Sequence, residues 1–310
     1  MTIPLVPPAD VVIAVTDLTR RFGATLALDR LSLEVSRGQV FGLVGANGAG
    51  KTTLIKHLLG LYAPLAGSVR VFGLAPTREP ARVLGRIGFL SEDRDLPTWM
   101  RVEELLRYSA AFYPQWDRAY AEQLRDQFLL DPQARVGRLS RGELAKAGLL
   151  VALAHRPDLL ILDEPSSGLD PLVRRQMLEA IVRSVAEEGR TVFFSSHLLD
   201  EIERVSDHLA MLARGRIVLR GDLAQVLESH HRLTLRFARP LVRPPTLPGA
   251  LSVAGGGLEW TAVANGALPE LTAAAKALGA QVVAEDPATL EEIFLARAAT
   301  FGATVGPTEG

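Results

Sequence analysis

The sequence predicts an α/β protein with a mostly parallel core sheet, an antiparallel β layer near the N-terminus, a helical insertion and a small C-terminal α+β domain. Three observations lead to this prediction. Apolar strand patterns alternate with amphipathic helical patterns, a glycine-rich segment joins a strand to a helix at residues 45–53, and residues 95–156 have helical periodicity. The length of 310 residues is compatible with two domains.

The elements before the helical insertion are short. A helical pattern follows the glycine-rich segment and ends near Gly60. Strand patterns enriched in β-branched residues surround this helix, and we expect the early ones to form the antiparallel layer. These patterns cover residues 11–15, 31–35, 40–44, 67–73 and 87–90.

Strands and helices alternate again after the helical insertion. Residues 159–163 (LLILD) are continuously apolar, which is typical of a strand buried on both faces of a parallel sheet. The next helix is expected to begin at Pro171 and to end at Gly189. A buried strand at 191–196 follows, and a pair of strands around Arg214-Gly215 is expected to complete the core.

The composition changes after about residue 230, where the pattern becomes that of a small α+β domain. The proline-rich segment 239–248 and the glycines at 255–257 are expected to form loops between its apolar strands. The predicted organisation is a core over 10–230 with its helical subdomain at 95–156, a C-terminal domain over 231–300 and a tail over 301–310.

Composition excludes several classes of function. The chain has no cysteine, which rules out disulfides, thiolate nucleophiles and cysteine-based metal sites. Its 34 basic and 35 acidic residues nearly cancel, so there is no overall attraction to nucleic acid or anionic lipid. The N-terminus lacks a secretory pattern and no apolar run is long enough to span a bilayer. We therefore expect a soluble, cytoplasmic protein that acts on a membrane only through a partner.

The glycine-rich segment is a phosphate-binding loop by its composition and position. Its glycines allow the tight turn that points backbone N–H groups at phosphate oxygens, and the following helix adds its positive dipole end. Lys51 supplies a cation for the β- and γ-phosphates, and the Thr52 hydroxyl can ligate Mg²⁺. The expected nucleotide-binding residues are Gly45, Ala46, Asn47, Gly48, Ala49, Gly50, Lys51, Thr52 and Thr53.

Two carboxylates end the buried strand at 159–163. Asp163 is placed to hold Mg²⁺ beside the phosphate loop, and Glu164 is placed one residue beyond it to polarise the attacking water as general base. An Asp-Glu pair that only caps a strand end is the alternative interpretation. The apolar strand ahead of the pair and the phosphate loop upstream favour the catalytic one.

Residues 139–143 (LSRGE) lie about twenty residues before LILDEP, and with both motifs the chain resembles the ATP-binding subunit of an ABC transporter over roughly residues 10–230. The resemblance implies that this segment is the signature that clamps the γ-phosphate bound on the opposite subunit. Ser140 and Gly142 match that pattern, whereas Arg141 and Glu143 depart from it. Taken alone, the segment would be a helix N-cap.

The same resemblance assigns further residues. It places Asp170 in the D-loop that reaches across the dimer, although Asp170 before Pro171 is also suited to capping the next helix. It makes His197 the switch histidine that contacts the γ-phosphate, and Phe22 the aromatic that stacks on adenine. Where the family usually has a glutamine, this chain has Glu92, which we expect to ligate Mg²⁺ or to orient water.

The resemblance implies a function in transport. Two such subunits would sandwich two ATP·Mg²⁺, as a homodimer or with a related ATPase subunit, and drive a separately encoded membrane permease. The chain would lie peripherally at the inner face of the cell membrane. Residues 286–298 (DPATLEEIFLARA) resemble the end of exporter ATPases, which favours export.

Two alternatives have other functions. The first is a soluble ABC-type ATPase that acts on ribosomes or DNA. The single cassette, the lack of a long coiled coil and the lack of a basic stripe argue against it, and no nucleic acid partner is expected. The second is a regulatory nucleotide-binding module without hydrolysis, which Glu164 argues against.

Overall fold

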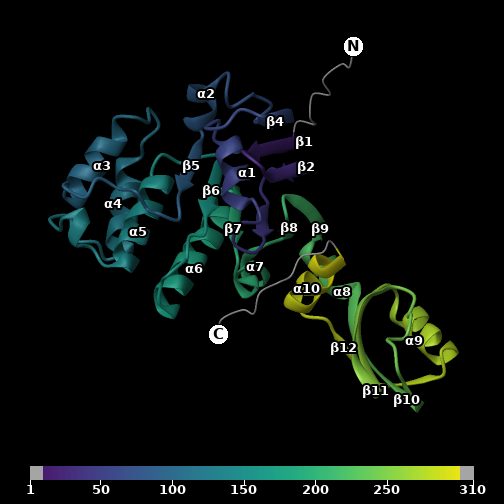
Figure 1. Ribbon diagram of the computed structural model, residues 1–310. Coiled ribbons are helices and arrows are strands. Elements are labelled where there is room, and N and C mark those ends of the chain that lie inside the picture. Colours follow the sequence, from purple (N-terminus) through teal and green to yellow (C-terminus); the bar gives the residue numbers. More distant parts are fainter. Residues whose placement is uncertain (1–9, 301–310) are drawn as a thin grey trace.

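The structure, a computed structural model, describes residues 10–300 and contains three β-sheets (Figure 1). The first is antiparallel and has the strand order β2-β1-β4. Its strands are β1 (Val11–Phe22), β2 (Thr25–Ser36) and β4 (Ala66–Val71). The predicted antiparallel layer is therefore confirmed.

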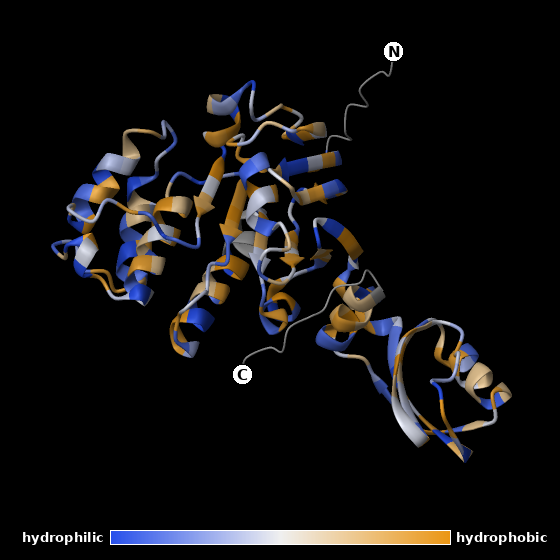
Figure 2. Cartoon of the chain, viewed as in Figure 1, coloured by the Kyte–Doolittle hydropathy of each residue, from blue (hydrophilic) through white to orange (hydrophobic). Residues whose placement is uncertain are grey.

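The second sheet forms the core and has the order β5-β6-β7-β3-β8-β9, with every neighbouring pair parallel except β8 and β9. Hydrophobic residues run continuously along its central strands because both faces are covered (Figure 2). Its strands are β3 (Val40–Val44), β5 (Ile87–Leu90), β6 (Leu159–Asp163), β7 (Thr191–Ser196), β8 (His208–Ala213) and β9 (Arg216–Asp222).

Strand register in the core sheet places the carboxyl ends of its central strands together. Val44 of β3 lies opposite Ser196 of β7, and Asp163 of β6 lies opposite Ser195. The segments that follow these three strands therefore emerge at one edge of the sheet. This edge is where open α/β sheets bind their ligands.

Helices cover both faces of the core sheet, and a separate helical group lies between β5 and β6 in the chain (Figure 1). In this group, Leu149 and Leu150 of α5 belong to the same buried cluster as Leu160 and Leu162 of β6. The helices of this part are α1 (Lys51–Leu58), α2 (Pro80–Leu84), α3 (Val102–Ala110), α4 (Arg118–Gln127), η1 (Val136–Arg138), α5 (Arg141–Leu153), α6 (Pro171–Glu188) and α7 (Leu199–Val205). No helix within residues 10–300 combines the length and the apolar character needed to cross a bilayer.

The third sheet has the order β11-β10-β12 and lies with α9 at the far end of the molecule (Figure 1). The loop expected at Gly255–Gly257 is a tight turn inside β11. The chain folds back on itself there, because the N–H of Asn265 donates to the Gly249 carbonyl at 2.9 Å and a Cβ at Gly255 would lie 2.5 Å from the carbonyl oxygen of Glu259. Gly255 and Gly257 have the positive φ angles that such a turn requires. The elements of this part are α8 (Leu223–Glu228), β10 (His230–Leu241), β11 (Ala250–Asn265), α9 (Leu268–Ala277), β12 (Ala280–Pro287) and α10 (Leu290–Thr300).

The last helix returns to the core instead of packing only on the C-terminal sheet. Ile293 and Phe294 of α10 belong to the same buried cluster as Ile202 of α7 and Leu223 of α8. The N–H of Leu290 also donates to the Glu203 carboxylate at 3.2 Å. The two parts of the chain therefore share a hydrophobic junction. The expected tail, residues 301–310, lies outside the described residues.

Candidate functional site

The phosphate loop lies between β3 and α1, wedged against two neighbouring segments. A side chain at Gly50, whose φ is 115°, would place its Cβ 2.7 Å from the carbonyl oxygen of Ala27. A Cβ at Gly45 would lie 2.6 Å from the carbonyl oxygen of Leu212. The N–H of Gly215 donates to the carbonyl of Ala49 at 2.9 Å. Glycine is therefore required at both positions because neighbouring backbone closes around the loop.

Lys51 begins α1 and is nearly buried, with 6% of its side chain exposed. Its ammonium donates to the carbonyl oxygen of Gly45 at 2.6 Å and lies 2.9 Å from Oε1 of Glu164. Helix α1 has no acidic residue in its first turn, so its dipole end is not neutralised there. The cation and the helix dipole together suit a phosphate group.

Glu164 follows β6 directly and is held by three groups from β7 and the segment after it. Its N–H donates to the Ser195 carbonyl at 3.1 Å, and its backbone lies in the left-handed region with a φ of 49°. Its Oε2 accepts from Nδ1 of His197 at 2.7 Å and from the His197 N–H at 3.2 Å. Lys51, Glu164 and His197 thus form one chain of contacts, although 146 positions separate the first from the last.

Asp163 is buried beside this chain of contacts. Its Oδ1 accepts a hydrogen bond from the Ser195 hydroxyl at 2.6 Å, and the same hydroxyl accepts from the N–H of Glu164 at 3.2 Å. Ser195 therefore holds both the Asp163 carboxylate and the backbone of Glu164. Sequence analysis missed Ser195 because its signal, a serine near the end of an apolar strand, is common.

A cavity of about 360 Å³ opens above the phosphate loop. Glu92 reaches this cavity from the segment after β5 and accepts from the Ser167 hydroxyl at 3.3 Å. Arg94 holds the neighbouring loop by donating to the carbonyl oxygens of Pro165 and Ser167 at 3.2 and 2.6 Å. The lining comprises Thr25, Leu26, Ala27, Ala46, Asn47, Gly48, Gly50, Lys51, Thr52, Thr53, Glu92, Glu164 and Arg214.

Two parts of this lining carry no recognisable sequence signal. Residues 25–27 begin β2, and Arg214 lies in the β8–β9 turn with a φ of 48°. The sequence marks Arg214-Gly215 only as a turn. Their position at the cavity depends on how the antiparallel sheet and β9 pack around the phosphate loop.

The oxygen donors at this cavity fit Mg²⁺ only in combination with phosphate. Thr52 and Glu92 line the cavity, and Asp163 lies at the adjoining end of β6. Among residues 10–300, no three acidic or histidine side chains gather closely enough to hold a metal by themselves. Mg²⁺ in nucleotide sites takes one or two protein oxygens and completes its shell with phosphates and water. The residues present suit that kind of binding.

The signature segment forms the N-terminus of α5. The hydroxyl of Ser140 accepts from the N–H of Glu143 at 3.2 Å, while the Glu143 carboxylate accepts from the N–H of Ser140 at 2.8 Å. This is a reciprocal capping box, and its hydrogen bonds hold the pKa of Glu143 below its usual range. A Cβ at Gly142 would lie 3.0 Å from Val173 of α6. None of Ser140, Arg141, Gly142 and Glu143 lines the cavity of their own chain.

Two other predicted residues have local partners. Asp170 caps α6, where its Oδ1 accepts from the N–H groups of Leu172 and Val173 at 3.0 and 3.1 Å. Phe22 ends β1 with an exposed fraction of 40% and makes an edge contact with Tyr62 at 5.5 Å between ring centroids. Phe22 is not part of the cavity lining.

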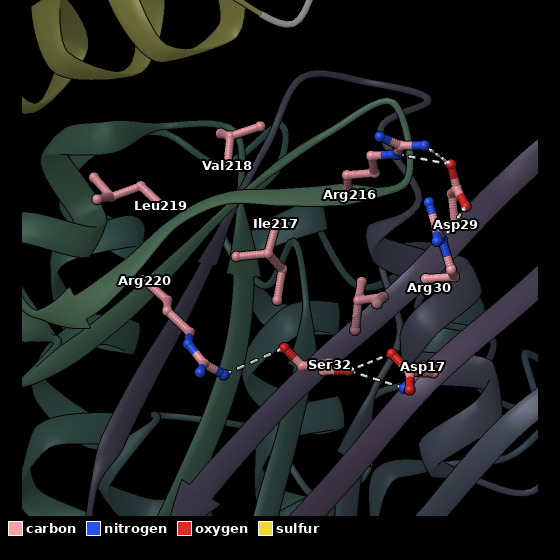
Figure 3. A pocket seen from close by; sticks show the side chains of 10 residues that line it. Asp17, Asp29, Arg30, Ser32, Arg216, Ile217, Val218, Leu219 and Arg220 are labelled. Atoms are coloured by element: carbon pink, nitrogen blue, oxygen red, sulfur yellow. Dashed lines mark hydrogen bonds and ion pairs between the residues drawn. The ribbon is translucent and has the colours of Figure 1, made fainter.

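A second, more open cavity of about 560 Å³ lies between β2 and β9, the edge strands of two sheets (Figure 3). Arg216 closes one end by donating to Asp29 at 2.7 Å. Arg220 of β9 closes the other end by donating to the Ser32 carbonyl at 3.4 Å. The Arg216–Asp29 ion pair and the bond of Arg220 to the Ser32 backbone both link β9 to β2 and so hold the two sheets together.

The sequence and the fold are both similar to those of known proteins. A family profile described as ABC transporter matches residues 28–167. The bacitracin transport ATP-binding protein BcrA of Bacillus licheniformis is 34% identical over 209 residues, which cover 67% of this chain and 68% of that protein. The ABC transporter ATP-binding protein NatA of Bacillus subtilis is 32% identical over 235 residues, covering 73% and 95% respectively.

Solved structures agree with these relatives. An ATP-binding subunit of an ABC transporter has a TM-score of 0.64 and 30% identity, with 70% of this chain and 92% of that chain covered. A dimeric bacterial ABC transporter cassette has a TM-score of 0.62 and 20% identity, with 68% and 98% covered, which shows the shared fold alone. The predicted fold class and family resemblance are confirmed.

Proposed function

The chain belongs to the ABC transporter ATP-binding subunits, a family of ATPases, and from this premise we propose that Glu164 is its general base and that ATP hydrolysis drives a separate membrane permease. The observation that carries the proposal is the contact of Glu164 with both Lys51 and His197 at the mouth of the phosphate loop. Lys51 and Glu164 line the cavity, and His197 contacts Glu164 from the segment after β7. A loop that merely bound a nucleotide would not need them together.

The two oxygens of Glu164 have different partners, and this difference suggests the order of events. Oε1 contacts the Lys51 ammonium, and a phosphate oxygen of a bound nucleotide would compete with Oε1 for that ammonium. Oε2 accepts a hydrogen bond from His197. When Lys51 turns to the β- and γ-phosphates, Oε1 is released to accept a proton from the attacking water. His197 continues to hold the carboxylate in place. Catalysis then consists of positioning and charge neutralisation.

The assignment of the nucleotide follows the lining of the cavity. On this basis we assign the phosphates to residues 45–53. The assignment of the adenine to Phe22, which ends β1 outside the lining, rests on the family resemblance alone. Thr52, Asp163 and Glu92 would hold Mg²⁺, which neutralises phosphate charge when bound.

We further propose that the chain works as a pair around two ATP·Mg²⁺. Ser140, Gly142 and Asp170 lie outside the cavity of their own chain, which supports a role for α5 and the D-loop at the opposite subunit. Glu143, one of the two residues that depart from the family pattern, caps the start of α5 together with Ser140 and so rigidifies this helix end. The pair would lie at the inner membrane face against the permease. The resemblance of residues 286–298 to exporters favours export, and the similarity to BcrA, a bacitracin transport ATP-binding protein, favours a role in transport.

The test is the variant Glu164→Gln, which keeps the size of the side chain but removes its basicity. We expect ATP binding to be retained, hydrolysis to fall by about a hundredfold or more, and an ATP-bound dimer to accumulate in size-exclusion chromatography. Glu122→Gln, an exposed glutamate on α4, is the matched control and should hydrolyse at the wild-type rate. Wild-type turnover by Glu164→Gln would refute the assignment.

A further inference from the structure

A second buried glutamate, Glu201 of α7, lies behind the proposed catalytic pair. Its side chain has no exposed surface, and sequence analysis assigned it no role. A buried carboxylate is costly unless hydrogen bonds and a cation compensate its desolvation. The groups that offset the desolvation of the Glu201 carboxylate therefore indicate the role of this residue.

The partners come from the two loops that present Glu164 and His197. The hydroxyl of Ser166, two residues after Glu164, donates a short hydrogen bond to Oε1 of Glu201. The hydroxyl of Ser196, immediately before His197, donates to Oε2 at 2.8 Å. Each carboxylate oxygen thus holds one of the two loops.

Two further contacts complete this arrangement. The N–H of Leu198 donates to the Ser196 hydroxyl oxygen at 3.0 Å, so this hydroxyl accepts from Leu198 while its own proton is donated to Glu201. Nε of Arg174 lies 3.4 Å from Oε1 and supplies a partial counter-charge from α6. Burial raises the pKa of Glu201, and the two hydroxyls and Arg174 oppose this effect. Ser166 and Ser196 are themselves buried, so water does not replace their bond to the carboxylate.

We propose that Glu201 is a positioning residue that fixes the distance between Glu164 and His197 by holding the Ser166 and Ser196 loops together. This inference rests on the proposed function, because Glu201 would affect catalysis only by positioning Glu164, the proposed general base. Displacement of a catalytic group by about 1 Å can cost about a hundredfold in rate. Loss of the link should therefore lower turnover while the phosphate loop, which Glu201 does not touch, still binds nucleotide.

The experiment compares kcat and ATP affinity in Glu201→Gln and in Asp200→Asn. The second variant is the matched control, because Asp200 is the exposed neighbour of Glu201 on α7 and loses the same charge. Glutamine has only one acceptor oxygen, so one of the two loops loses its acceptor. We expect kcat to fall at least tenfold in Glu201→Gln with an ATP Kd within twofold of wild type, and no change in Asp200→Asn.

A smaller loss of kcat, or an equal loss of affinity, would overturn the positioning role. If Glu201→Gln does not fold, Ser166→Ala and Ser196→Ala each sever one link and should each lower kcat at unchanged affinity. If Glu201→Gln does fold, adding it to the variant that carries both Ser166→Ala and Ser196→Ala should lower kcat no further, because both links are already absent. Inactivity of Glu164→Gln together with full activity of Glu201→Gln would refute this inference alone, whereas full activity of Glu164→Gln would refute the proposed function.

Discussion

The ion pair between Lys51 and Glu164 should stabilise the nucleotide-free protein, and a double-mutant cycle can measure by how much. The two charged atoms are 2.9 Å apart and both side chains are almost completely buried. At an effective dielectric constant of about 20, unit charges at this separation attract by roughly 6 kcal/mol, which is a ceiling because both groups also lose hydration. We expect a coupling free energy of about 2 kcal/mol, because loss of hydration offsets much of the attraction.

The single variants should differ because the partners left behind differ. Lys51→Met leaves a buried carboxylate with His197 as its remaining side-chain partner, and should lower the free energy of unfolding by about 3 kcal/mol. Glu164→Gln leaves the ammonium with the Gly45 carbonyl, and should cost about 1 kcal/mol. The double variant should be more stable than the sum of these losses predicts, by the coupling free energy.

The assay is urea unfolding of the four proteins at pH 7 in the presence of EDTA and without nucleotide. The exposed pair Arg175 and Glu179 on α6 provides the control cycle, where solvent screens the charges and no coupling should be measurable. Losses that add within about 0.5 kcal/mol at Lys51 and Glu164 would refute the reasoning, because the two groups would then not interact in solution.

Two further predictions concern pH and the junction with the C-terminal part. Burial lowers the pKa of His57, His155 and His230 below the ordinary value of about 6.5, so below that pH the unfolded chain takes up protons that the folded chain does not. The free energy of unfolding should therefore fall as the pH is lowered from 7.5 to 5.5, by up to about 1.4 kcal/mol per pH unit for each histidine. In urea unfolding measured across this pH range, His155→Gln should make the free energy of unfolding less dependent on pH. An unchanged pH dependence in this variant would contradict the prediction. Ile293→Ala on α10 should lower the free energy of unfolding by about 2–4 kcal/mol, because Ile293 is fully buried. Leu295→Ala, on the exposed side of the same helix, should lower it by less than about 1 kcal/mol. Equal losses in the two variants would show that α10 does not pack into the core.

Sequence patterns predict most of the fold because they are local. The continuous apolar run of β6, the glycine-rich turn before α1 and the Pro171 start of α6 each follow from rules about neighbouring residues. Sequence patterns fail at the end of β10, where the proline-rich pattern predicts a loop from residue 239 but the strand continues to Leu241, and at α8, which is too short to show a helical period. In both places the partner segments decide the backbone conformation.

In the candidate site, too, some residues can be recognised from local sequence and others only from the tertiary structure. Residues 45–53, Asp163 and Glu164 are recognisable from the chain alone because phosphate binding needs a particular run of residue types directly after a strand. The tertiary structure decides which residues support them, since Ser195 and Glu201 acquire their hydrogen-bond partners only when separate strands end at one sheet edge. The same packing brings Arg214 to the cavity. It also decides that α10 returns to the core, because burial of Ile293 requires surfaces of α7 and α8 that local sequence does not specify.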